Sequence, residues 1–391
     1  MIVTGRVVTP ERVLDGFVRI DGTEIAEVGT EEGAPVAAST PAGAPASKPV
    51  IVPGFVDLHC HGGGGYTFTT GDPAAARAAA AFHLRHGTTT LLASLVSAPH
   101  PLMRTATAAY VPLVGEGVLA GVHFEGPYLS AARCGAQNPA HLRDPSSEEL
   151  AELVALGGGA VRMVTLAPER PGALAAIRQL AGHGVVAAVG HTDASYEQTL
   201  AAVAAGATVA THLCNGMRPV HHREPGPIVA LLGAEGVVCE LIADGAHLHD
   251  GMLRFVARTA PGRTALVTDA IAAAGMPDGA YELGGQAVVV VDRVARLSTA
   301  DGSPGAIAGS TLTMDAALRR AVVGAGVSLV DAVRMAATTP AGVLGLAGTV
   351  GSIAPGRRAD LVELDPDLRV RRVMRAGEWV SSVDLASGGG G

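Results

Sequence analysis

The sequence of 391 residues has little of three things: aromatic residues, cysteine and lysine. Aromatics make up 3% of the chain and hydrophobic residues 48%, so we expect a core built from alanine, valine and leucine. The four cysteines are scattered and form neither a CxxC pair nor a disulfide framework. Lys48 is the only lysine, which excludes a mechanism that needs a lysine at any other position.

Long apolar runs and clusters of basic residues are also missing. A net charge of −8 without a basic cluster argues against a nucleic-acid or anionic membrane partner. The amino terminus, MIVTGRVVTPERVLDG, lacks the basic and apolar regions of a signal peptide. The uncharged stretch Thr199 to Met217 is interrupted by Thr, Gly, His and Asn and does not read as a membrane span. We therefore expect a soluble, cytoplasmic protein.

From Val50 onward, apolar strands alternate with helical segments. No GxGxxG motif or phosphate-binding loop follows any strand, which favours a closed (β/α)₈ barrel over an open doubly wound sheet. The chain length fits a barrel of about 250 residues plus an additional piece. The eight expected strands lie at 50–58, 88–97, 117–125, 160–167, 184–191, 207–214, 237–244 and 264–269.

Short β runs at both ends predict the additional piece. Residues 1–30, and later DLVELD and VRRVMRAGEWV, alternate in the manner of strands, whereas 31–49 reads as a Pro/Ala/Ser linker or mobile loop. We expect an α/β fold in which both termini form a small β-sandwich domain beside the barrel. The expected division is 1–49 and 346–385 for the small domain, 50–345 for the barrel with a β-hairpin inserted near 276–302, and 386–391 for a disordered tail.

Two histidines stand at the ends of neighbouring strands. The apolar run VVAAVG leads to His191, and the next strand, ATVATHLCN, carries His212. Parallel strands of a βαβ unit point the same way, so both imidazoles project at the carboxyl end of the sheet, where barrel enzymes carry their catalytic groups. Taken alone, the pair is as compatible with two hydrogen-bonded strand-end histidines as with a metal site.

The first barrel strand ends in the HxH motif of VPGFVDLHCHGGGG. In an extended segment His59 and His61 share a face while Cys60 points away. Two imidazoles on one inner face are costly without a partner. Together with the two strand-end histidines, they indicate a metal site.

Two carboxylates follow apolar strands at the same end. Glu125, in GVHFEGPYLS, is better explained as a metal ligand than as a loop glutamate, because a carboxylate there needs a cation. Asp269, in ALVTDA, could exchange a proton with a metal-bound water. A helix N-cap is the competing role for Asp269, but no clear helix follows it. His123 shares the face of Glu125 only if the strand is regular, and it stays unassigned.

This pattern resembles the amidohydrolase superfamily, which has HxH on strand one, histidines on strands five and six, and an aspartate on strand eight. Strand four, AVRMVTLA, lacks the carboxylated lysine of many members, so the resemblance points to the branch with a strand-three glutamate, here Glu125. Nearly the whole chain is similar to the family of N-acetylglucosamine-6-phosphate deacetylases. The similar motifs, in the same order, are PGFVDLHCHG, HFEGPYLS, GAQNPAHL, VGHTDASYEQ, ATHLCNGM, REPG, IADGAHLH, LVTDA and AGSTLTM.

The resemblance implies a role for each matching position. Glu125, His191 and His212 would bind an essential divalent metal, and His59 and His61 a second one. Zinc is the first choice, and iron or another divalent ion also suits these ligands. Asp269 would be the catalytic acid and base. The implied substrate-binding residues are Ala136, Gln137, Asn215, Gly216, Arg223, His247, Ile307, Ala308 and Gly309.

Two matching positions depart from the family pattern. Gln137 stands where the family commonly has histidine, and Gly216 stands where it more often has alanine. The loop before Gln137 also contains Cys134 beside Arg133, which leaves open a structural cysteine or a redox-sensitive one.

The implied reaction is hydrolysis of N-acetyl-D-glucosamine 6-phosphate to D-glucosamine 6-phosphate and acetate, in amino-sugar catabolism and cell-wall sugar recycling. The alternatives are a deacetylase for another amino sugar phosphate or an N-acyl amino acid, and a noncatalytic amidohydrolase-like scaffold. The resemblance also implies a homodimer with shared active sites. In that dimer the loop Met217–Pro227 would carry Arg223 to the phosphate group in the partner's site.

Overall fold

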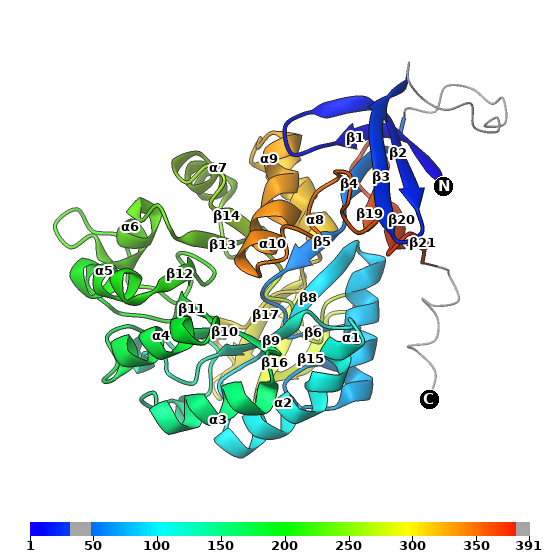
Figure 1. Cartoon of the computed structure of the whole chain (residues 1–391). Coiled ribbons are helices and arrows are strands. Elements are labelled where there is room, and N and C mark those ends of the chain that lie inside the picture. The colour runs from blue at the N-terminus through cyan, green and yellow to red at the C-terminus, as the bar shows by residue number, and fades with distance from the viewer. Residues whose placement is uncertain (32–47, 381–391) are drawn as a thin grey trace.

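A parallel barrel forms the centre of the molecule (Figure 1). The computed structural model describes residues 1–31 and 48–380, so most of the expected linker and the whole expected tail lie outside the described residues. Strand order in the barrel follows the sequence, and neighbouring strands are parallel. The strands are β5 (Phe55–Asp57), β8 (Thr88–Leu95), β9 (Gly121–Glu125), β10 (Val161–Leu166), β11 (Val186–Val189), β12 (Ala207–Ala210), β13 (Val238–Ile242) and β14 (Thr264–Val267).

The barrel closes between its last strand and its first. The backbone N–H of Asp269 donates to the carbonyl of His59 at 2.8 Å, and Cys60 pairs with Ala270 in a parallel bridge. The carboxyl ends of all eight strands therefore form one ring. The predicted (β/α)₈ fold is confirmed.

Helices cover the outside of the barrel (Figure 1). Asp72 caps α1 by accepting a hydrogen bond from Ala74, and Ser195 and Gln198 form a capping box at the start of α5. The helices are α1 (Pro73–Arg85), α2 (His100–Gly115), α3 (Ser147–Gly157), α4 (Ala173–Gly182), α5 (Tyr196–Ala205), α6 (Gly226–Gly233), α7 (Asp250–Thr259), α8 (Met314–Arg319), α9 (Leu329–Val333) and α10 (Thr339–Val343), with π-helical turns after α8 and α9.

The first expected strand, 50–58, is wrong as a single element. Its first half is β4 (Val50–Pro53), which belongs to the small domain, and only β5 belongs to the barrel. The chain passes between the two sheets at Gly54, where a Cβ atom would lie 2.2 Å from Oγ1 of Thr89. The barrel therefore begins a few residues later than predicted, at a position that only glycine fits.

Both termini build the small domain. One sheet runs in the order β21-β20-β19-β4-β1-β2-β3, and it folds back so that the N–H of Ile25 reaches the carbonyl of Arg357 at 2.8 Å. The sandwich is therefore one continuous sheet, with strands from both ends as expected. The strands not yet given are β1 (Ile2–Val8), β2 (Val13–Asp21), β3 (Glu24–Thr30), β19 (Leu361–Leu364), β20 (Val370–Arg375) and β21 (Glu378–Trp379).

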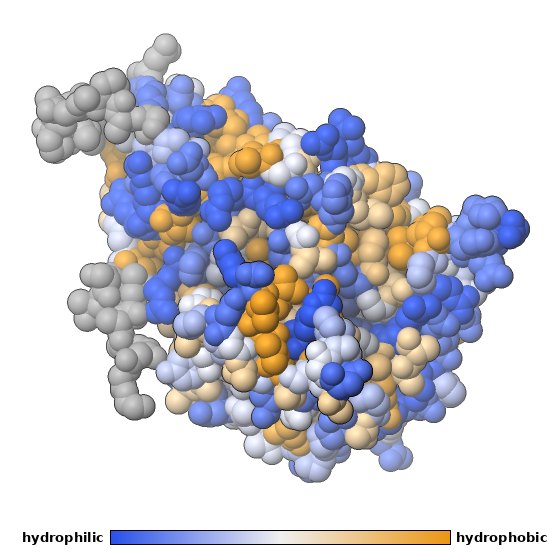
Figure 2. Space-filling view, turned by 180° about the vertical axis from the view of Figure 1, so that it is seen from behind, coloured by the Kyte–Doolittle hydropathy of each residue, from blue (hydrophilic) through white to orange (hydrophobic). Residues whose placement is uncertain are grey.

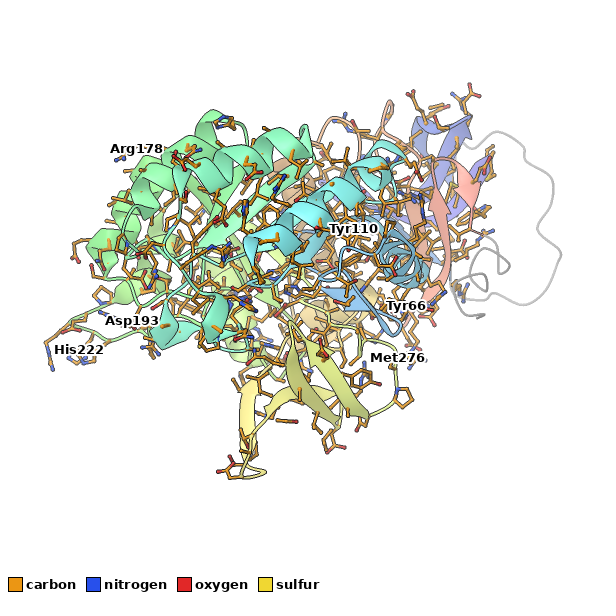
Figure 3. The ribbon with its side chains drawn as sticks, turned by 90° about the horizontal axis from the view of Figure 1, so that it is seen from below. Tyr66, Tyr110, Arg178, Asp193, His222 and Met276 are labelled. Carbon is orange, nitrogen blue, oxygen red and sulfur yellow. The ribbon has the colours of Figure 1, made fainter. Side chains whose placement is uncertain are left out.

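The insertion after β14 is larger than the expected hairpin. It is a four-stranded antiparallel sheet with its own small core, and Figure 3 shows it projecting from the barrel. The outer strands were missed because each offers only four or five residues of weak pattern. The strands are β15 (Gly279–Leu283), β16 (Gln286–Val291), β17 (Val294–Ser298) and β18 (Pro304–Ile307).

The core is built mainly from alanine, valine and leucine, as the composition predicts. The face seen in Figure 2 intersperses hydrophilic and hydrophobic residues. No helix among the described residues has the length and apolar character that crossing a membrane requires.

Candidate active site

A pocket of about 240 Å³ opens at the carboxyl ends of the barrel strands. It brings together most of the residues predicted from the sequence. Two lie elsewhere: Ala308 packs in the core of the insertion, and Arg223 is exposed outside the pocket. His59 is fully buried at the site. The lining residues are His61, Glu125, Gly135, Ala136, Gln137, His191, His212, Asn215, Gly216, His247, Asp269, Leu283, Ala306, Ile307 and Gly309.

Glu125 is the meeting point of four histidines, one of which is His59, whose Nε2 atom lies 3.5 Å from Oε1 of Glu125. Its Oε1 atom lies 2.9 Å from Nε2 of His191 and 2.9 Å from Nε2 of His212. Its Oε2 atom lies 3.2 Å from Nε2 of His61. The carboxylate therefore spans the space between the HxH motif and the histidines of the fifth and sixth strands.

Asp269 meets the HxH motif from the other side. Its Oδ1 atom lies 3.2 Å from Nε2 of His61 and 3.5 Å from Nε2 of His59. These two Nε2 atoms lie 3.1 Å from each other. One aspartate oxygen thus faces both nitrogens.

Hydrogen bonds at Nδ1 fix the tautomer and the ring orientation of two of these histidines. Nδ1 of His61 donates to the carbonyl of Ser94 at 3.0 Å, and Nδ1 of His191 donates to the carbonyl of Arg133 at 2.8 Å. Since the proton resides on Nδ1, the lone pair of a neutral ring lies on Nε2. Both rings therefore direct a ligand atom into the site.

The charges at the site are strongly coupled. Burial disfavours the charged form of Glu125, but His59 and His191 hold the pKa of its carboxyl well below its usual range. Burial likewise opposes the charge of Asp269, yet His59 and His61 lower its pKa. Burial opposes protonation of His61, but hydrogen bonds with Asp269 and Glu125 raise the pKa of its imidazole to about 9. The site thus attracts positive charge despite being buried.

A divalent cation fits this donor set. Two sets of three ligand atoms lie within 4.8 Å of one another, one from His59, His61 and Asp269, the other from His59, Glu125 and His212. Facing lone pairs at these distances repel one another unless a proton or a metal ion lies between them. Imidazole nitrogen and carboxylate oxygen are ligands that zinc and iron accept.

Three of these residues have an unusual backbone. His191, His212 and Asp269 take positive φ angles of 45°, 28° and 49°. Residues other than glycine avoid this region, and such conformations gather at functional sites. Here the turn at each strand end aims the side chain into the pocket.

Gln137 holds the central carboxylate in place. Its amide nitrogen donates to Oε2 of Glu125 at 2.5 Å, and its amide oxygen accepts from the N–H of Ser97 at 2.7 Å. Only 4% of the residue is exposed. Besides lining the pocket, Gln137 therefore orients Glu125.

His247 forms a buried pair with Asp244. Nδ1 of His247 donates to Oδ2 of Asp244 at 2.7 Å, and the second Asp244 oxygen accepts from the N–H groups of Ala246 and His247. Burial lowers the pKa of His247, but the hydrogen bond and the charge of Asp244 raise it above its ordinary value. The pair thus favours a protonated imidazole in the pocket wall.

Comparison with known proteins identifies this architecture. Residues 50–380 match the model of the amidohydrolase family. The chain belongs to the amidohydrolase family. It is 38% identical to an N-acetylgalactosamine-6-phosphate deacetylase of Escherichia coli O157:H7, covering 85% of this chain and 88% of the relative. It is 36% identical to the N-acetylglucosamine-6-phosphate deacetylase of Bacillus subtilis, covering 93% and 92%.

A solved structure agrees over nearly the full length. A mutant N-acetyl-D-glucosamine-6-phosphate deacetylase of Mycobacterium smegmatis, solved in complex with N-acetyl-D-glucosamine-6-phosphate, is 46% identical to this chain. The match covers 97% of this chain and 98% of that one, with a TM-score of 0.90. The predicted family and fold of this amidohydrolase are confirmed.

Gly216 departs from the common alanine for a local reason. Its φ is +58°, and a Cβ atom would lie 2.8 Å from Nδ1 of His191. In this amidohydrolase an alanine would therefore push on a site histidine. The glycine also leaves its backbone open to the pocket.

The loop that carries Arg223 extends away from its own pocket. Figure 3 shows His222, the preceding residue, far from the barrel, and Arg223 donates to Nε2 of His222 at 2.7 Å. The base of the loop is anchored by Asp193, which pairs with Arg218 at 2.9 Å and with Arg133 at 2.8 Å. Arg133 is thus directed to Asp193, which argues against activation of the neighbouring cysteine.

Two buried acidic residues of this amidohydrolase are not predicted from the sequence. Glu240, in the middle of β13, lies behind His59, and Asp57 accepts hydrogen bonds from the N–H and hydroxyl of Thr268. Burial raises the pKa of Asp57 to about 6. His123, left unassigned, is a buried core histidine bonded to the hydroxyls of Ser94 and Thr165.

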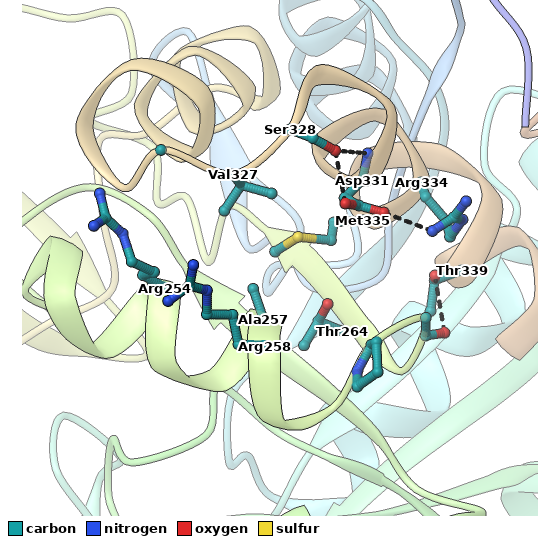
Figure 4. A pocket seen from close by; sticks show the side chains of 13 residues that line it. Arg254, Ala257, Arg258, Thr264, Val327, Ser328, Asp331, Arg334, Met335 and Thr339 are labelled. Atoms are coloured by element: carbon teal, nitrogen blue, oxygen red, sulfur yellow. Dashed lines mark hydrogen bonds and ion pairs between the residues drawn. The ribbon is translucent and has the colours of Figure 1, made fainter. Parts of the chain in front are cut away.

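A second pocket, of about 270 Å³, is shown in Figure 4. It is lined by Thr264, the first residue of β14, so it lies at the amino end of that strand. Two of its arginines already have partners: Arg334 pairs with Asp331 at 2.7 Å, and Arg254 donates to the carbonyl of Ala325. No histidine, cysteine or paired carboxylates line it. The chemistry of this amidohydrolase therefore belongs to the first pocket.

Proposed function

We propose that this amidohydrolase hydrolyses the acetamide of N-acetyl-D-glucosamine 6-phosphate to D-glucosamine 6-phosphate and acetate. The observation that carries the proposal is the convergence of four histidines, Glu125 and Asp269 at the floor of one pocket. The relatives named above are deacetylases of amino sugar phosphates. We place the reaction in the cytoplasm, where phosphorylated sugars are retained by their charge.

The cofactor in this proposal is a divalent metal, zinc by preference and iron or another divalent ion as alternatives. Glu125, His191 and His212 would hold the essential ion, while His59 and His61 would hold a second. When bound, such an ion polarises a carbonyl and acidifies water.

The side chains would divide the remaining work. Asp269 is ionised at neutral pH, because its pKa is lowered, so it can take up a proton and return it to the amide nitrogen. His247, whose pKa is raised by Asp244, would in its protonated form donate a hydrogen bond from Nε2 to the carbonyl oxygen as negative charge develops there. Asn215, the backbone of Gly216 and the wall formed by 307–309 would orient the sugar.

Substrate recognition is proposed to need two chains. Within one chain Arg223 lies outside the pocket, and its loop extends away from the barrel. A homodimer in which each loop reaches the other pocket would supply a guanidinium to the substrate's phosphate group.

A second substrate has support of its own. The Escherichia coli relative acts, by its name, on the galactosamine epimer. The same floor of the pocket could serve either epimer, because both carry the same acetamide.

The test is an acetate-release assay on metal-stripped chain, then on chain reloaded with Zn²⁺ or Fe²⁺. We expect reloading to restore turnover of N-acetylglucosamine 6-phosphate, with the galactosamine epimer assayed alongside. Unphosphorylated N-acetylglucosamine should have a much lower kcat/KM. Equal turnover with and without phosphate would contradict the role of Arg223, and no turnover of any acetamide would contradict a deacetylase.

A further inference from the structure

Glu240 is an unexpected charge inside the barrel. It lies in the middle of β13, and none of its surface is exposed. The interior layers of such barrels are normally filled by branched apolar side chains. A carboxylate in this position is costly unless strong partners compensate.

The partners of Glu240 come from the active site. Its Oε2 atom lies 3.3 Å from Nδ1 of His59 and accepts from the N–H of His212 at 3.2 Å. Its Oε1 atom has no partner among the described residues. No arginine or lysine pairs with it in the described part of the chain, where His59 is the ionisable side chain in contact with it.

A purely structural role explains only part of this arrangement. Accepting from the N–H of His212 needs an oxygen but no charge, and a glutamine would serve. A carboxylate opposite Nδ1 of His59, in contrast, keeps the proton on that nitrogen and leaves the lone pair on Nε2. Nε2 is the atom that faces His61 and Asp269.

We propose that Glu240 is a positioning residue that sets the occupancy of the second metal position by orienting His59. His59 belongs to both candidate sets of ligand atoms, but Glu125 also has His191 and His212 at 2.9 Å from its Oε1 atom, closer than His59 at 3.5 Å. Loss of the carboxylate therefore weakens the ion held by the HxH motif more than the ion held by Glu125. This inference rests on the metal dependence proposed above.

The test titrates metal-free full-length chain with Zn²⁺ against a competing chelator, for wild type and Glu240→Gln. Glutamine keeps the shape and an acceptor for His212 but removes the charge. We expect the weaker of two Zn²⁺ equivalents to lose about 10- to 100-fold in affinity, with a clearly smaller loss at the tighter one. Glu240→Asp should recover part of the loss.

Two controls separate positioning from folding. Glu363→Gln removes another buried glutamate, one paired with Arg372 in the small domain, and should change neither equivalent. The unfolding midpoint of the metal-free Glu240→Gln chain should stay near that of wild type.

Unchanged Zn²⁺ affinities, equal losses at both equivalents, or a wild type with one equivalent would overturn the role of Glu240. In each of those cases wild-type deacetylation could still be intact. A wild type that binds no metal and releases no acetate would instead remove the proposed function itself.

Discussion

At the level of a single residue, Asp269 combines a contact with two histidines and the capacity to take up a proton. It lies in a left-handed backbone conformation, with 7% of its surface exposed, and its carboxylate contacts two histidines. An asparagine would retain the shape and one acceptor oxygen, but it could not take up a proton.

Replacing Asp269 by asparagine should therefore separate binding from turnover. We expect kcat to fall by about 10²- to 10⁴-fold, the usual contribution of a positioned acid or base, while the ion held by Glu125 stays bound. Acetate release and metal analysis of the same preparation provide the measurement. Turnover near the wild-type level would remove Asp269 from proton transfer.

Residues at strand ends could be anticipated, whereas Glu240 could not. Glu125 and His191 follow apolar runs, and a parallel barrel brings such positions together. Glu240 reads as one polar residue within an apolar strand, and its partner His59 lies 181 positions away. Only the closed barrel shows that the two side chains meet.

At the level of elements, the sequence predicted which strands and helices exist better than it predicted where each one begins and ends. The eight barrel strands are present, but β4 belongs to the sheet of the small domain, and the space at Gly54, between β4 and β5, has no room for a Cβ atom. On α5 the buried residues are Thr199, Ala202 and Ala205, whose small side chains let the helix lie close to the barrel.

A partly buried pair of His86 and Asp315 joins the end of α1 to the start of α8. Asp315 accepts from the hydroxyl of Thr313 at 2.6 Å and lies 3.2 Å from Nδ1 of His86. Burial raises the pKa of Asp315, but His86, Thr313 and Arg319 outweigh burial and lower it below its ordinary value. A lowered folded pKa means that the stabilisation is present above the unfolded pKa and is lost as pH falls through the folded one.

Asp315→Asn should reduce the free energy of unfolding at pH 7 by about 1–3 kcal/mol. The difference from wild type should shrink below about pH 4, where the unfolded carboxyl takes up its proton. Denaturant unfolding at pH 7 and pH 3.5 checks both statements. Asp331→Asn, in an exposed pair with Arg334, is the control and should have little effect at either pH. A loss of the same size at both pH values would show that charge is not the cause.

At the level of the whole molecule, the position of Arg223 outside its own pocket bears on how many chains complete one active site. If Arg223 acts in the partner's pocket, chains carrying Arg223→Ala and chains carrying Asp269→Asn are each inactive alone. A mixed dimer would then contain one site with both lesions and one with neither.

Mixing the two variants should thus restore activity, to about half the wild-type value in the mixed dimers. The measurement is acetate release after subunit exchange, with mixed dimers isolated through two affinity tags. If mixed dimers form but stay inactive, Arg223 serves its own subunit. A chain that stays monomeric at assay concentrations would contradict sharing altogether.

The shared sheet of the small domain also imposes an order in time. β4 pairs with β1 on one side and with β19 on the other, where Ile51 meets Glu363. A ribosome releases Ile51 long before it reaches Glu363, so one edge of β4 stays unpaired while the whole barrel is synthesised. Contacts between such distant residues also form slowly. The small domain is therefore the last part of the nascent chain that can be completed. Until β19 is made, the unpaired edge of β4 is the segment that most needs protection from pairing with another chain.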